Sequence, residues 1–352
     1  MKIKIALLDQ DANYLSRIST VFTNRFSEKL EVYSFTDMEV ALQNLKTSKI
    51  NVFIASDAFD IDTTLLPKHC GFAYFVESAS IESYKDQPAI CKFQKVEMIY
   101  KTILEIFSDN VSDSIGIKFD SDSNVRIVTF VSASGGTGSS SSSAACAKSF
   151  AASGQKTLYL NLEQFGSVDP FFSGAGQTDF SDVIFALKSK KTNLSLKLES
   201  NVRQDPSGVF FYASPKKALD MMELKTEEVQ KLITDLKLTG SYDNIVFDID
   251  FSFNASTMEI LKQSTTVVFV SDGSEISNIK FMRAYTAIEI LDERADVPLL
   301  PRLVVFYNKF SNKTGKTLDD VAHSIGGAPK YDHATADQVI SQLVGLGVFQ
   351  KL

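Results

Sequence analysis

The chain has 352 residues, of which 44% are hydrophobic and 22% charged, and its formal net charge is −7 at pH 7. This length predicts two packed domains, and the negative charge argues against a broad nucleic-acid-binding surface. The three cysteines and three histidines lack metal-ligand or disulfide spacing, so we predict no structural zinc site. Because no signal peptide and no apolar run of ~20 residues is present, we expect a cytoplasmic protein without direct membrane insertion.

The first 110 residues predict a doubly wound α/β domain, in which strands alternate with helices. The second expected helix carries Thr36 as its N-cap and Glu39 three residues later, which is a capping-box pattern. The expected strands are 2–8, 30–35, 52–55, 72–76 and 89–93, and the expected helices are 14–26, 36–45 and 96–107.

Acidic and basic residues follow the strands of this domain. Asp9 and Asp11 come after the first strand, and Lys92 lies at the end of the fifth. The domain resembles the receiver domain of response regulators, which keeps an acidic metal-binding pair and a lysine at these places. The resemblance implies a phosphoacceptor where Ser56 stands, with Asp57 one residue late. Since phosphoryl transfer to a receiver needs a carboxylate nucleophile, we expect a degenerate site that is not phosphorylated. A phosphorylated switch is the alternative.

The stretch 108–124 is polar and rich in Ser and Asp, which predicts a domain boundary. We assign 1–110 to an atypical receiver-like domain, 111–124 to a linker and 125–352 to a second domain.

The second domain opens with a strand, a glycine loop and a helix. The apolar run 125–131 predicts a buried strand, and a small-residue helix from about 140 to 153 is stopped by Gly154. The loop between them, 134–140, has the context of a phosphate-binding loop, in which glycines turn backbone N–H groups toward an anion. A Ser/Gly linker is the alternative, but a linker is not expected between a buried strand and an Ala-rich helix.

This loop resembles the deviant phosphate loop of the ParA/MinD ATPases, K-G-G-x-G-K-[ST]. In this resemblance Ser140 takes the place of the Mg²⁺-binding Ser/Thr, while Ser134 and Ser139 replace the two lysines. The resemblance implies a P-loop NTPase fold with ATP and Mg²⁺ as ligands. The expected nucleotide-binding residues of the loop are Gly135, Gly136, Thr137, Gly138, Ser139 and Ser140.

The loss of both lysines shapes the expected chemistry. The backbone cradle can survive it, but stabilisation of charge on the transferring phosphoryl group depends on Lys, Arg and Mg²⁺. We therefore expect ATP binding with weak or absent hydrolysis. Lys216 and Lys217 could lie near a phosphate and replace the missing cations, although such lysines are more often solvated charges on the surface.

Three further segments match the order of motifs in that family. The run 242–249 predicts a buried strand ending in Asp248, which matches a Walker B aspartate that holds Mg²⁺. Where the family keeps D-x-D, this chain has Asn161 and Glu163, so Glu163 and Asp248 are weak catalytic candidates. The resemblance also makes Asn308, after the strand 302–307, the adenine-contacting residue. Other expected elements are strands 157–162, 209–212 and 265–270, a helix after 214–217, and helices 182–188, 226–236 (with Thr226 as N-cap) and 274–291.

The C-terminal run 339–349 is apolar, but it lacks the basic face of a membrane-binding helix and is interrupted by two glycines. We expect it to pack on the second domain.

A receiver-like domain joined to a ParA/MinD-like domain resembles the TadZ/CpaE family. This resemblance implies a cytoplasmic, homodimeric, ATP-binding localisation factor for pilus assembly in a Flp (tight-adherence) secretion system. Its expected partners are pilus and secretion proteins at the inner membrane, with recruitment to a pole or to the cytoplasmic face of the membrane and no nucleic acid. The alternatives are an active MinD/ParA-type positioning ATPase and a response regulator with an ATPase-like output domain.

Overall fold

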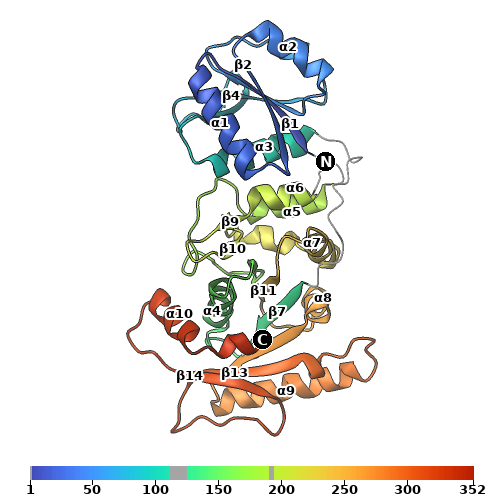
Figure 1. Ribbon diagram of the computed structural model, residues 1–352. Helices are drawn as coiled ribbons and strands as arrows, with labels where there is room; N and C mark the ends of the chain where they lie inside the picture. Colours follow the sequence, from blue (N-terminus) through green and yellow to red (C-terminus); the bar gives the residue numbers. More distant parts are fainter. Residues whose placement is uncertain (1, 111–124, 190–193) are drawn as a thin grey trace. The chain divides into compact units, whose positions relative to one another are not determined.

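The computed structural model describes residues 2–110, 125–189 and 194–352, and the chain divides into two compact units (Figure 1). The predicted linker, 111–124, lies outside the described residues. The first unit comprises Met1–Ile117 and Ser189–Ser200, and the second comprises Lys118–Lys188 and Asn201–Leu352.

The first unit contains a six-stranded sheet of order β2-β1-β3-β4-β6-β5. All its pairings are parallel except the β5–β6 hairpin. Its strands are β1 (Ile3–Leu8), β2 (Leu30–Phe35), β3 (Val52–Ser56), β4 (Gly71–Val76), β5 (Ser83–Tyr84) and β6 (Gln87–Cys91). Its helices are α1 (Ala12–Arg25), α2 (Met38–Thr47), α3 (Val96–Asn110), α6 (Leu194–Asn201) and the 3₁₀ turn η1 (Thr63–Leu65).

All three helices predicted for residues 1–110 form, but strands and helices do not alternate throughout the first unit. The β3–β4 connection forms only η1, and the β4–β6 connection forms the short strand β5. Apolar side chains of the β3–β4 connection, Ile61 and Leu66, pack on the same core as α2 and so cover part of that sheet face. The strict alternation of strands and helices was therefore wrong at these two connections, while the doubly wound strand order is kept.

Helix α6 belongs to the first unit, although its residues lie within the range predicted for the second domain. Leu196 is buried in the core formed with α1 and α3. Tyr100 on α3 donates a hydrogen bond to Glu199 Oε1 at 3.0 Å, and Lys197 Nζ lies 3.0 Å from Asp109 Oδ1. Apolar burial and charge pairing together attach this helix to the unit.

Two predicted helix caps were wrong by one residue. The N-cap of α2 is Asp37 rather than Thr36, and its Oδ1 accepts the Val40 N–H at 3.0 Å. Thr226 is the first residue of the helix α7 rather than its cap. A carboxylate accepts backbone N–H groups at least as well as a hydroxyl, so the neighbouring Asp37 takes the cap position.

The second unit contains an eight-stranded sheet of order β14-β13-β12-β7-β11-β8-β10-β9, parallel except for β9–β10. Its strands are β7 (Arg126–Val131), β8 (Thr157–Asn161), β9 (Arg203–Gln204), β10 (Phe210–Phe211), β11 (Asn244–Asp248), β12 (Thr266–Ser271), β13 (Leu303–Phe310) and β14 (Ser324–Pro329). Its α-helices are α4 (Ser139–Ala152), α5 (Phe180–Lys188), α7 (Thr226–Leu238), α8 (Ala255–Gln263), α9 (Glu275–Asp292) and α10 (Ala336–Gly345). The 3₁₀ turns are η2 (Ala218–Glu223), where a helix was expected, η3 (Leu300–Arg302) and η4 (Val348–Lys351).

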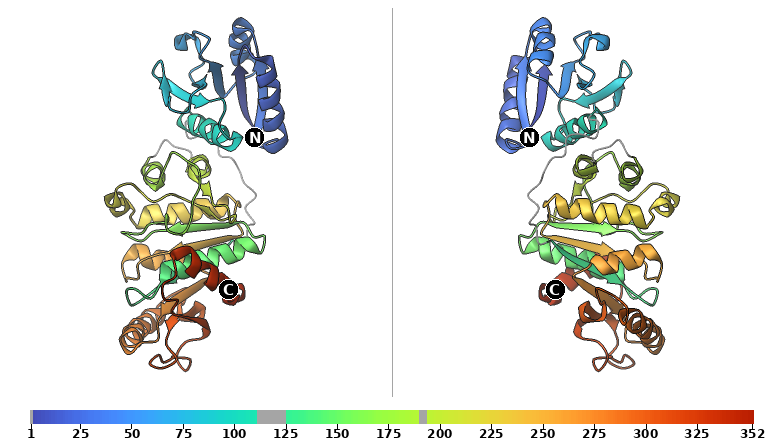
Figure 2. Two further views of the ribbon diagram at one scale, coloured as in Figure 1. Left: turned by 90° about the vertical axis from the view of Figure 1, so that its left-hand side faces the viewer. Right: turned by 90° about the vertical axis from the view of Figure 1, so that its right-hand side faces the viewer.

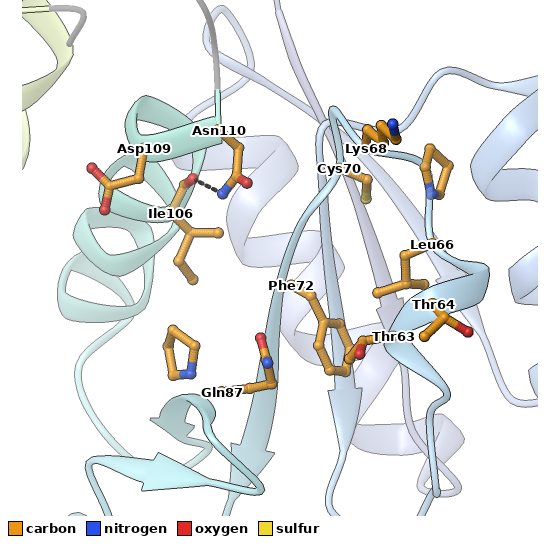
Figure 3. Close-up of a pocket in the computed structure, with 12 residues that line it drawn as sticks. Thr63, Thr64, Leu66, Lys68, Cys70, Phe72, Gln87, Ile106, Asp109 and Asn110 are labelled. Atoms are coloured by element: carbon orange, nitrogen blue, oxygen red, sulfur yellow. Dashed lines mark hydrogen bonds between the residues drawn. The ribbon is translucent and has the colours of Figure 1, made fainter. Parts of the chain in front are cut away.

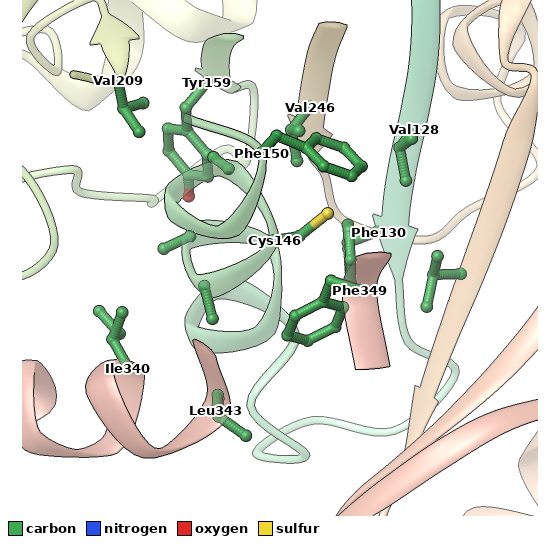
Figure 4. Close-up of a cluster of buried hydrophobic side chains, with 14 of the residues drawn as sticks. Val128, Phe130, Cys146, Phe150, Tyr159, Val209, Val246, Ile340, Leu343 and Phe349 are labelled. Atoms are coloured by element: carbon green, nitrogen blue, oxygen red, sulfur yellow. The ribbon is translucent and has the colours of Figure 1, made fainter. Parts of the chain in front are cut away.

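Helices lie on both faces of this sheet (Figure 2), and the serine-rich helix α4 packs directly on it. Ser142 and Ser143 are buried, and their hydroxyls donate to the carbonyls of Gly138 and Ser140, so the run is an ordered helix rather than a linker. Figure 4 shows Cys146 of this helix in the same cluster as Phe349. Small side chains on α4 allow this close packing.

The C-terminal segment packs on the second unit as expected. Helix α10 contacts α4, and Ile340, Leu343 and Phe349 are all buried in the same core (Figure 4). The Phe349 ring meets Phe130 edge-on, with centroids 6.0 Å apart, and packs in a tilted arrangement on Phe306, with centroids 5.1 Å apart. None of the described helices is long and apolar enough to span a membrane.

Candidate functional site

The glycine loop between β7 and α4 has the backbone of an anion cradle. Gly136 and Gly138 have φ angles of 79° and 85°, a region that side chains with a Cβ rarely enter. Gly138 is also the N-cap of α4, so the loop leads directly into a helix N-terminus. No atom lies within 4 Å of the position of a Cβ on Gly135 or Gly136. The loop is therefore open on this side and fits the approach of a phosphate.

Hydroxyl groups hold the loop from within. Thr137 is buried, and its Oγ1 donates to Ser132 Oγ at 2.9 Å, so Thr137 supports the loop rather than facing outward. The two serines at the lysine positions differ from it, because Ser134 Oγ and Ser139 Oγ are buried without a hydrogen-bond partner among the described residues. Buried polar atoms normally have partners, so two such atoms beside an open cradle fit a polar ligand.

Polar side chains meet at the carboxyl ends of β8 and β11. The Tyr159 hydroxyl and Asn161 Nδ2 both donate to Asp248 Oδ2, at 2.8 and 3.0 Å. Asn161 Nδ2 also donates to Glu163 Oε2 at 3.0 Å. Ser140 Oγ lies 3.3 and 3.2 Å from the two oxygens of the Glu163 carboxylate. The predicted magnesium and catalytic residues Ser140, Glu163 and Asp248 are thus joined in one network.

The sheet register explains why this network forms. Asp248 pairs with Asn161 across β11 and β8, and with Phe130 just before the loop across β11 and β7. Since parallel strands end at the same edge, the last residues of these strands lie beside the loop.

Burial dominates the electrostatics of Asp248. Its side chain is fully buried, and this burial, followed by the nearby Glu163 carboxylate, raises the pKa of Asp248 to about 8. Hydrogen bonds from Tyr159 and Ser140 act in the opposite direction. Burial also raises the pKa of Tyr159 well above its usual value, so this phenol stays a hydrogen-bond donor.

The donor set of this network fits Mg²⁺. Asp248 Oδ1 is buried without a hydrogen-bond partner among the described residues. A divalent cation would remove the unfavourable charge of a buried carboxylate beside Glu163. Mg²⁺ prefers carboxylate and hydroxyl oxygens and keeps several waters, so one carboxylate and the Ser140 hydroxyl are a sufficient protein contribution.

Asn161 acts as a donor in this site. Its amide bridges the Glu163 and Asp248 carboxylates, whereas an aspartate at position 161 would add a third negative charge. The close approach of Gly166, whose Cβ would lie 2.1 Å from Asn161 Oδ1, fixes the segment after β8 over this side chain. Glu163 is the remaining group near Ser140 that could act as a base.

Asn308 lies against the loop rather than apart from it. It is buried, and its Nδ2 donates to Thr137 O at 2.8 Å. A Cβ on Gly138 would lie 2.3 Å from the same nitrogen, so Gly138 must be glycine for this contact as well as for its φ angle.

Sequence reasoning missed two residues of this site. Tyr159 lies within a strand, where an aromatic residue is usually core, and no pattern distinguishes it. Lys309 Nζ donates to Gly136 O at 2.7 Å, and its position beside Asn308 was the available signal. The predicted alternative cations, Lys216 and Lys217, are exposed at the start of η2.

The first unit brings three of its predicted site residues together. Lys92 Nζ lies 2.6 Å from Asp9 Oδ2 and donates to Ser56 Oγ at 3.2 Å. The Asp9 and Lys92 side chains are only 3% and 11% exposed, so this is a buried ion pair. The position of the receiver phosphoacceptor thus holds a hydroxyl that is bonded to the lysine, with no carboxylate nucleophile in that place.

The other two receiver candidates lie outside this contact. Asp11 is exposed and caps α1, because its Oδ1 accepts the N–H groups of Asn13 and Tyr14 at 2.9 and 3.1 Å. Asp57 is half-buried, and Ser56 Oγ approaches its Oδ1 at a long 3.4 Å.

A cavity of about 460 Å³ lies elsewhere in the first unit (Figure 3). Its lining includes Thr63, Cys70, Phe72, Gln87 and Asp109, and none of the predicted site residues. Burial raises the pKa of Cys70 to about 12, so this thiol is not a reactive thiolate.

Comparison with known families agrees with this geometry in the first unit. Residues 1–108 match a family model described as TadZ-like, receiver domain. Over these residues the chain is similar to the TadZ-like receiver domain. The TadZ-like receiver domain covers β1 to α3, and therefore includes Asp9, Ser56 and Lys92.

The remainder of the chain is similar in fold to ATPases of the ParA type. The ParA family ATPase from Chlorobium tepidum TLS is 21% identical, with 64% of this chain and 96% of that chain covered and a TM-score of 0.50. The septum site-determining protein MinD from Pyrococcus horikoshii OT3, complexed with Mg-ADP, is 15% identical, with 65% and 100% covered and a TM-score of 0.49. No curated protein matches the chain.

These findings confirm the predicted fold class. A TadZ-like receiver domain is followed by an α/β unit with the fold of a ParA-type P-loop ATPase, which is the two-domain organisation of the TadZ/CpaE resemblance.

Proposed function

We propose that this protein is an ATP-binding localisation and assembly factor for a Flp (tight-adherence) pilus secretion system, with weak or no ATP hydrolysis. The observation that carries this proposal is the open glycine loop beside the network that contains Asp248. Both the cradle and the unpartnered Asp248 Oδ1 fit Mg²⁺-ATP. The TadZ-like receiver domain supports the pilus-assembly part of the proposal.

Each part of the ligand has a proposed site. Residues 135–140 would bind the phosphates through backbone N–H groups, and Ser140 and Asp248 would hold Mg²⁺. Asn308 would contact the adenine while it supports Thr137. When bound, Mg²⁺-ATP would supply phosphates to the glycine loop and a cation to the network that contains Asp248.

Slow turnover follows from the residues around the loop. Serines stand at both lysine positions, and Asn161 donates hydrogen bonds where the related family has an aspartate. Glu163, whose carboxylate contacts Ser140, is the base candidate of this site. Because positive charge normally stabilises the transferring phosphoryl group, we infer that ATP acts mainly as a bound signal.

The receiver domain would serve as an interaction domain that is not phosphorylated. Ser56 occupies the acceptor position and Lys92 is paired with Asp9. We propose a cytoplasmic homodimer whose two nucleotide units face each other near the loops, with pilus and secretion proteins at the inner membrane as its partners.

Isothermal titration calorimetry with Mg²⁺-ATP tests the proposal, with oligomer mass measured on the same samples. Gly135→Asp puts a negative charge on the loop at a position where a Cβ meets no atom within 4 Å. Gly345→Asp is the matched control, since its Cβ is equally unobstructed and lies at the end of α10. We expect ATP binding and a dimer for the wild type and the control, and loss of binding for Gly135→Asp.

Two results would contradict the proposal. Absence of ATP binding by the wild type would leave a scaffold with only the fold of an ATPase. Rapid steady-state hydrolysis that depends on Glu163 would instead favour an active positioning ATPase of the MinD/ParA type.

A further inference from the structure

The phosphate loop has no lysine of its own, yet a lysine from another strand lies on it. Lys309, in the last part of β13, donates from Nζ to Gly136 O at 2.7 Å. Its Cε lies 3.5 Å from the position of a Cβ on Gly138. The side chain therefore runs along the same glycines that form the cradle.

An irregularity in β13 explains this placement. The pairing of β13 with β14 shifts register between Tyr307 and Phe310, and Lys309 has a φ angle of 58°. In a regular strand, consecutive side chains point to opposite faces. Here Asn308 and Lys309 are consecutive, and both reach carbonyls of the same loop, at Thr137 and Gly136. The bulge directs both side chains to one target.

The backbone conformation of Lys309 is unfavourable for a residue with a side chain. Non-glycine residues with positive φ are uncommon, and they are concentrated at functional sites. Glycine would adopt this bulge more easily, but it would leave the loop without the ammonium group.

The ammonium group is free to take an anionic partner. Lys309 has no carboxylate within salt-bridge distance among the described residues, and its side chain is exposed. An ammonium carries three donors, of which one is used on the neutral carbonyl of Gly136. An anion beside the loop would be a stronger acceptor than that carbonyl.

We propose that Lys309 is the phosphate-binding cation of this loop: it supplies positive charge for holding ATP, while the lysine positions at Ser134 and Ser139 stay without the charge that turnover needs. Its ligand is the β- or γ-phosphate of a nucleoside di- or triphosphate. This inference rests on the proposed function, because it assumes that the loop binds such a nucleotide. According to this inference, the phosphate-binding positive charge comes from a residue of the β13 bulge and not from the glycine loop.

A purely structural role is the competing explanation, in which Lys309 only ties the bulge to Gly136. The two roles differ in what they need from the side chain. The structural role needs only a hydrogen-bond donor to Gly136 O, whereas phosphate binding needs the positive charge. Lys309→Gln keeps a neutral donor, Lys309→Arg keeps the charge, and Lys309→Ala keeps neither. Lys313→Ala is the matched control, since Lys313 is an exposed lysine of the loop after β13.

The test is calorimetric titration of ATP, adenosine and inorganic tripolyphosphate, each with Mg²⁺, into the wild type and these variants. We expect Lys309→Ala and Lys309→Gln to weaken ATP and tripolyphosphate binding about 10- to 100-fold, as for loss of a hydrogen bond to a charged group. Adenosine affinity should not change, Lys309→Arg should retain most of the affinity, and Lys313→Ala should match the wild type.

Thermal unfolding of the ligand-free variants separates folding effects from binding. Lys309→Gly relieves the positive φ angle, so it should unfold at the wild-type temperature or above while it binds ATP as weakly as Lys309→Ala. Equal ATP affinity in Lys309→Gln and the wild type would overturn the inference and leave the proposed function standing. Absence of ATP binding by the wild type would overturn both.

Discussion

The first unit (the receiver unit) and the second unit (the nucleotide unit, after its proposed ligand) each have an acidic site that lacks an expected charged residue. The effects on the charge balance of the two sites are opposite. In the receiver unit the missing group is a carboxylate, and Lys92 is paired with Asp9 and bonded to Ser56. In the nucleotide unit the missing groups are lysines, and Asp248 and Glu163 have no ion-pair partner among the described residues.

The difference shows that the sign of the lost charge decides whether the remaining charges of a degenerate site balance one another or favour binding of a ligand. Loss of a negative residue beside a lysine leaves balanced charges, so the receiver site is satisfied without a ligand. In the second unit burial, followed by the nearby Glu163 carboxylate, raises the pKa of Asp248 to about 8, and no ion pair among the described residues offsets this. Such a site gains from a cation, which fits the proposed binding of Mg²⁺-ATP.

The largest effect is expected from breaking the receiver ion pair. Lys92→Met leaves the nearly buried Asp9 without its partner and should lower the free energy of unfolding of the first unit by about 3 to 5 kcal/mol. Urea unfolding, with hydrogen exchange of the β1 amides to identify the unit, measures this. The matched control is Lys85→Met, because the Lys85–Asp60 pair is solvent-exposed and should contribute far less to stability than the buried pair. Equal losses in the two variants would refute the buried-pair account.

A smaller effect is expected from pH in the nucleotide unit. Because the pKa of Asp248 is raised to about 8, the ligand-free folded protein holds a proton that the unfolded chain releases above about pH 4. Stability should therefore fall as pH rises, by up to about 1.4 kcal/mol per pH unit, or about 2 to 3 kcal/mol between pH 6 and 8.

Asp248→Asn is the control for this pH dependence, since it removes the titrating carboxylate and keeps the side-chain shape. Unfolding at a series of pH values should show the slope in the wild type and its absence in the variant. Mg²⁺ and ATP together should reduce the wild-type slope, because a bound cation favours the ionised form. A wild-type slope that equals the variant slope would contradict the electrostatic account.

Ser56→Asp would convert the balanced receiver site into an unbalanced one. A second carboxylate beside Asp9 must share Lys92, so we expect a loss of about 1 to 2 kcal/mol in the free energy of unfolding of the first unit. Mg²⁺ should restore the loss in this variant and have no effect on the first unit of the wild type. Thermal unfolding with and without Mg²⁺ measures both, and an equal response of the two proteins would contradict the comparison.

The smallest effect is expected at the neighbouring residue. Asp57 is half-buried and takes no part in the contact between Lys92 and Asp9, so Asp57→Asn should change the free energy of unfolding by less than about 0.5 kcal/mol. Acetyl phosphate should not label the wild type at this residue. Labelling that disappears in Asp57→Asn would instead favour a response regulator.

The sequence predicted the parts of the fold that repeat a simple pattern. The strand, glycine loop and helix around Gly138 were correctly located, because hydrophobic runs and glycines identify them directly. Ser140, Glu163 and Asp248 were assigned to one site by the resemblance to the ParA/MinD motifs, and the structure brings them together because parallel strands end at one edge. Their order along the chain matches the order of the motifs in the ParA/MinD family.

Other features depend on contacts between distant residues. Tyr159 reaches Asp248 across 89 positions and Lys309 reaches Gly136 across 173 positions, and neither contact has a local sequence signal. The bulge that turns Lys309 toward the loop is a property of the β13–β14 pairing. Likewise, the attachment of α6 to the first unit rests on Leu196 and Glu199 packing against α1 and α3. Such tertiary contacts override local patterns.

Hydrogen–deuterium exchange of the wild type, with and without Mg²⁺-ATP, tests the contrast between the two sites most directly. We predict protection from exchange in peptides that cover the loop around Gly138 and the strand ends at Asn161 and Asp248. We predict no change in peptides that cover Asp9 and Lys92. Unchanged exchange in the loop, or protection confined to the receiver peptides, would contradict the claim that the nucleotide site is open to Mg²⁺-ATP while the receiver site is satisfied by its own residues.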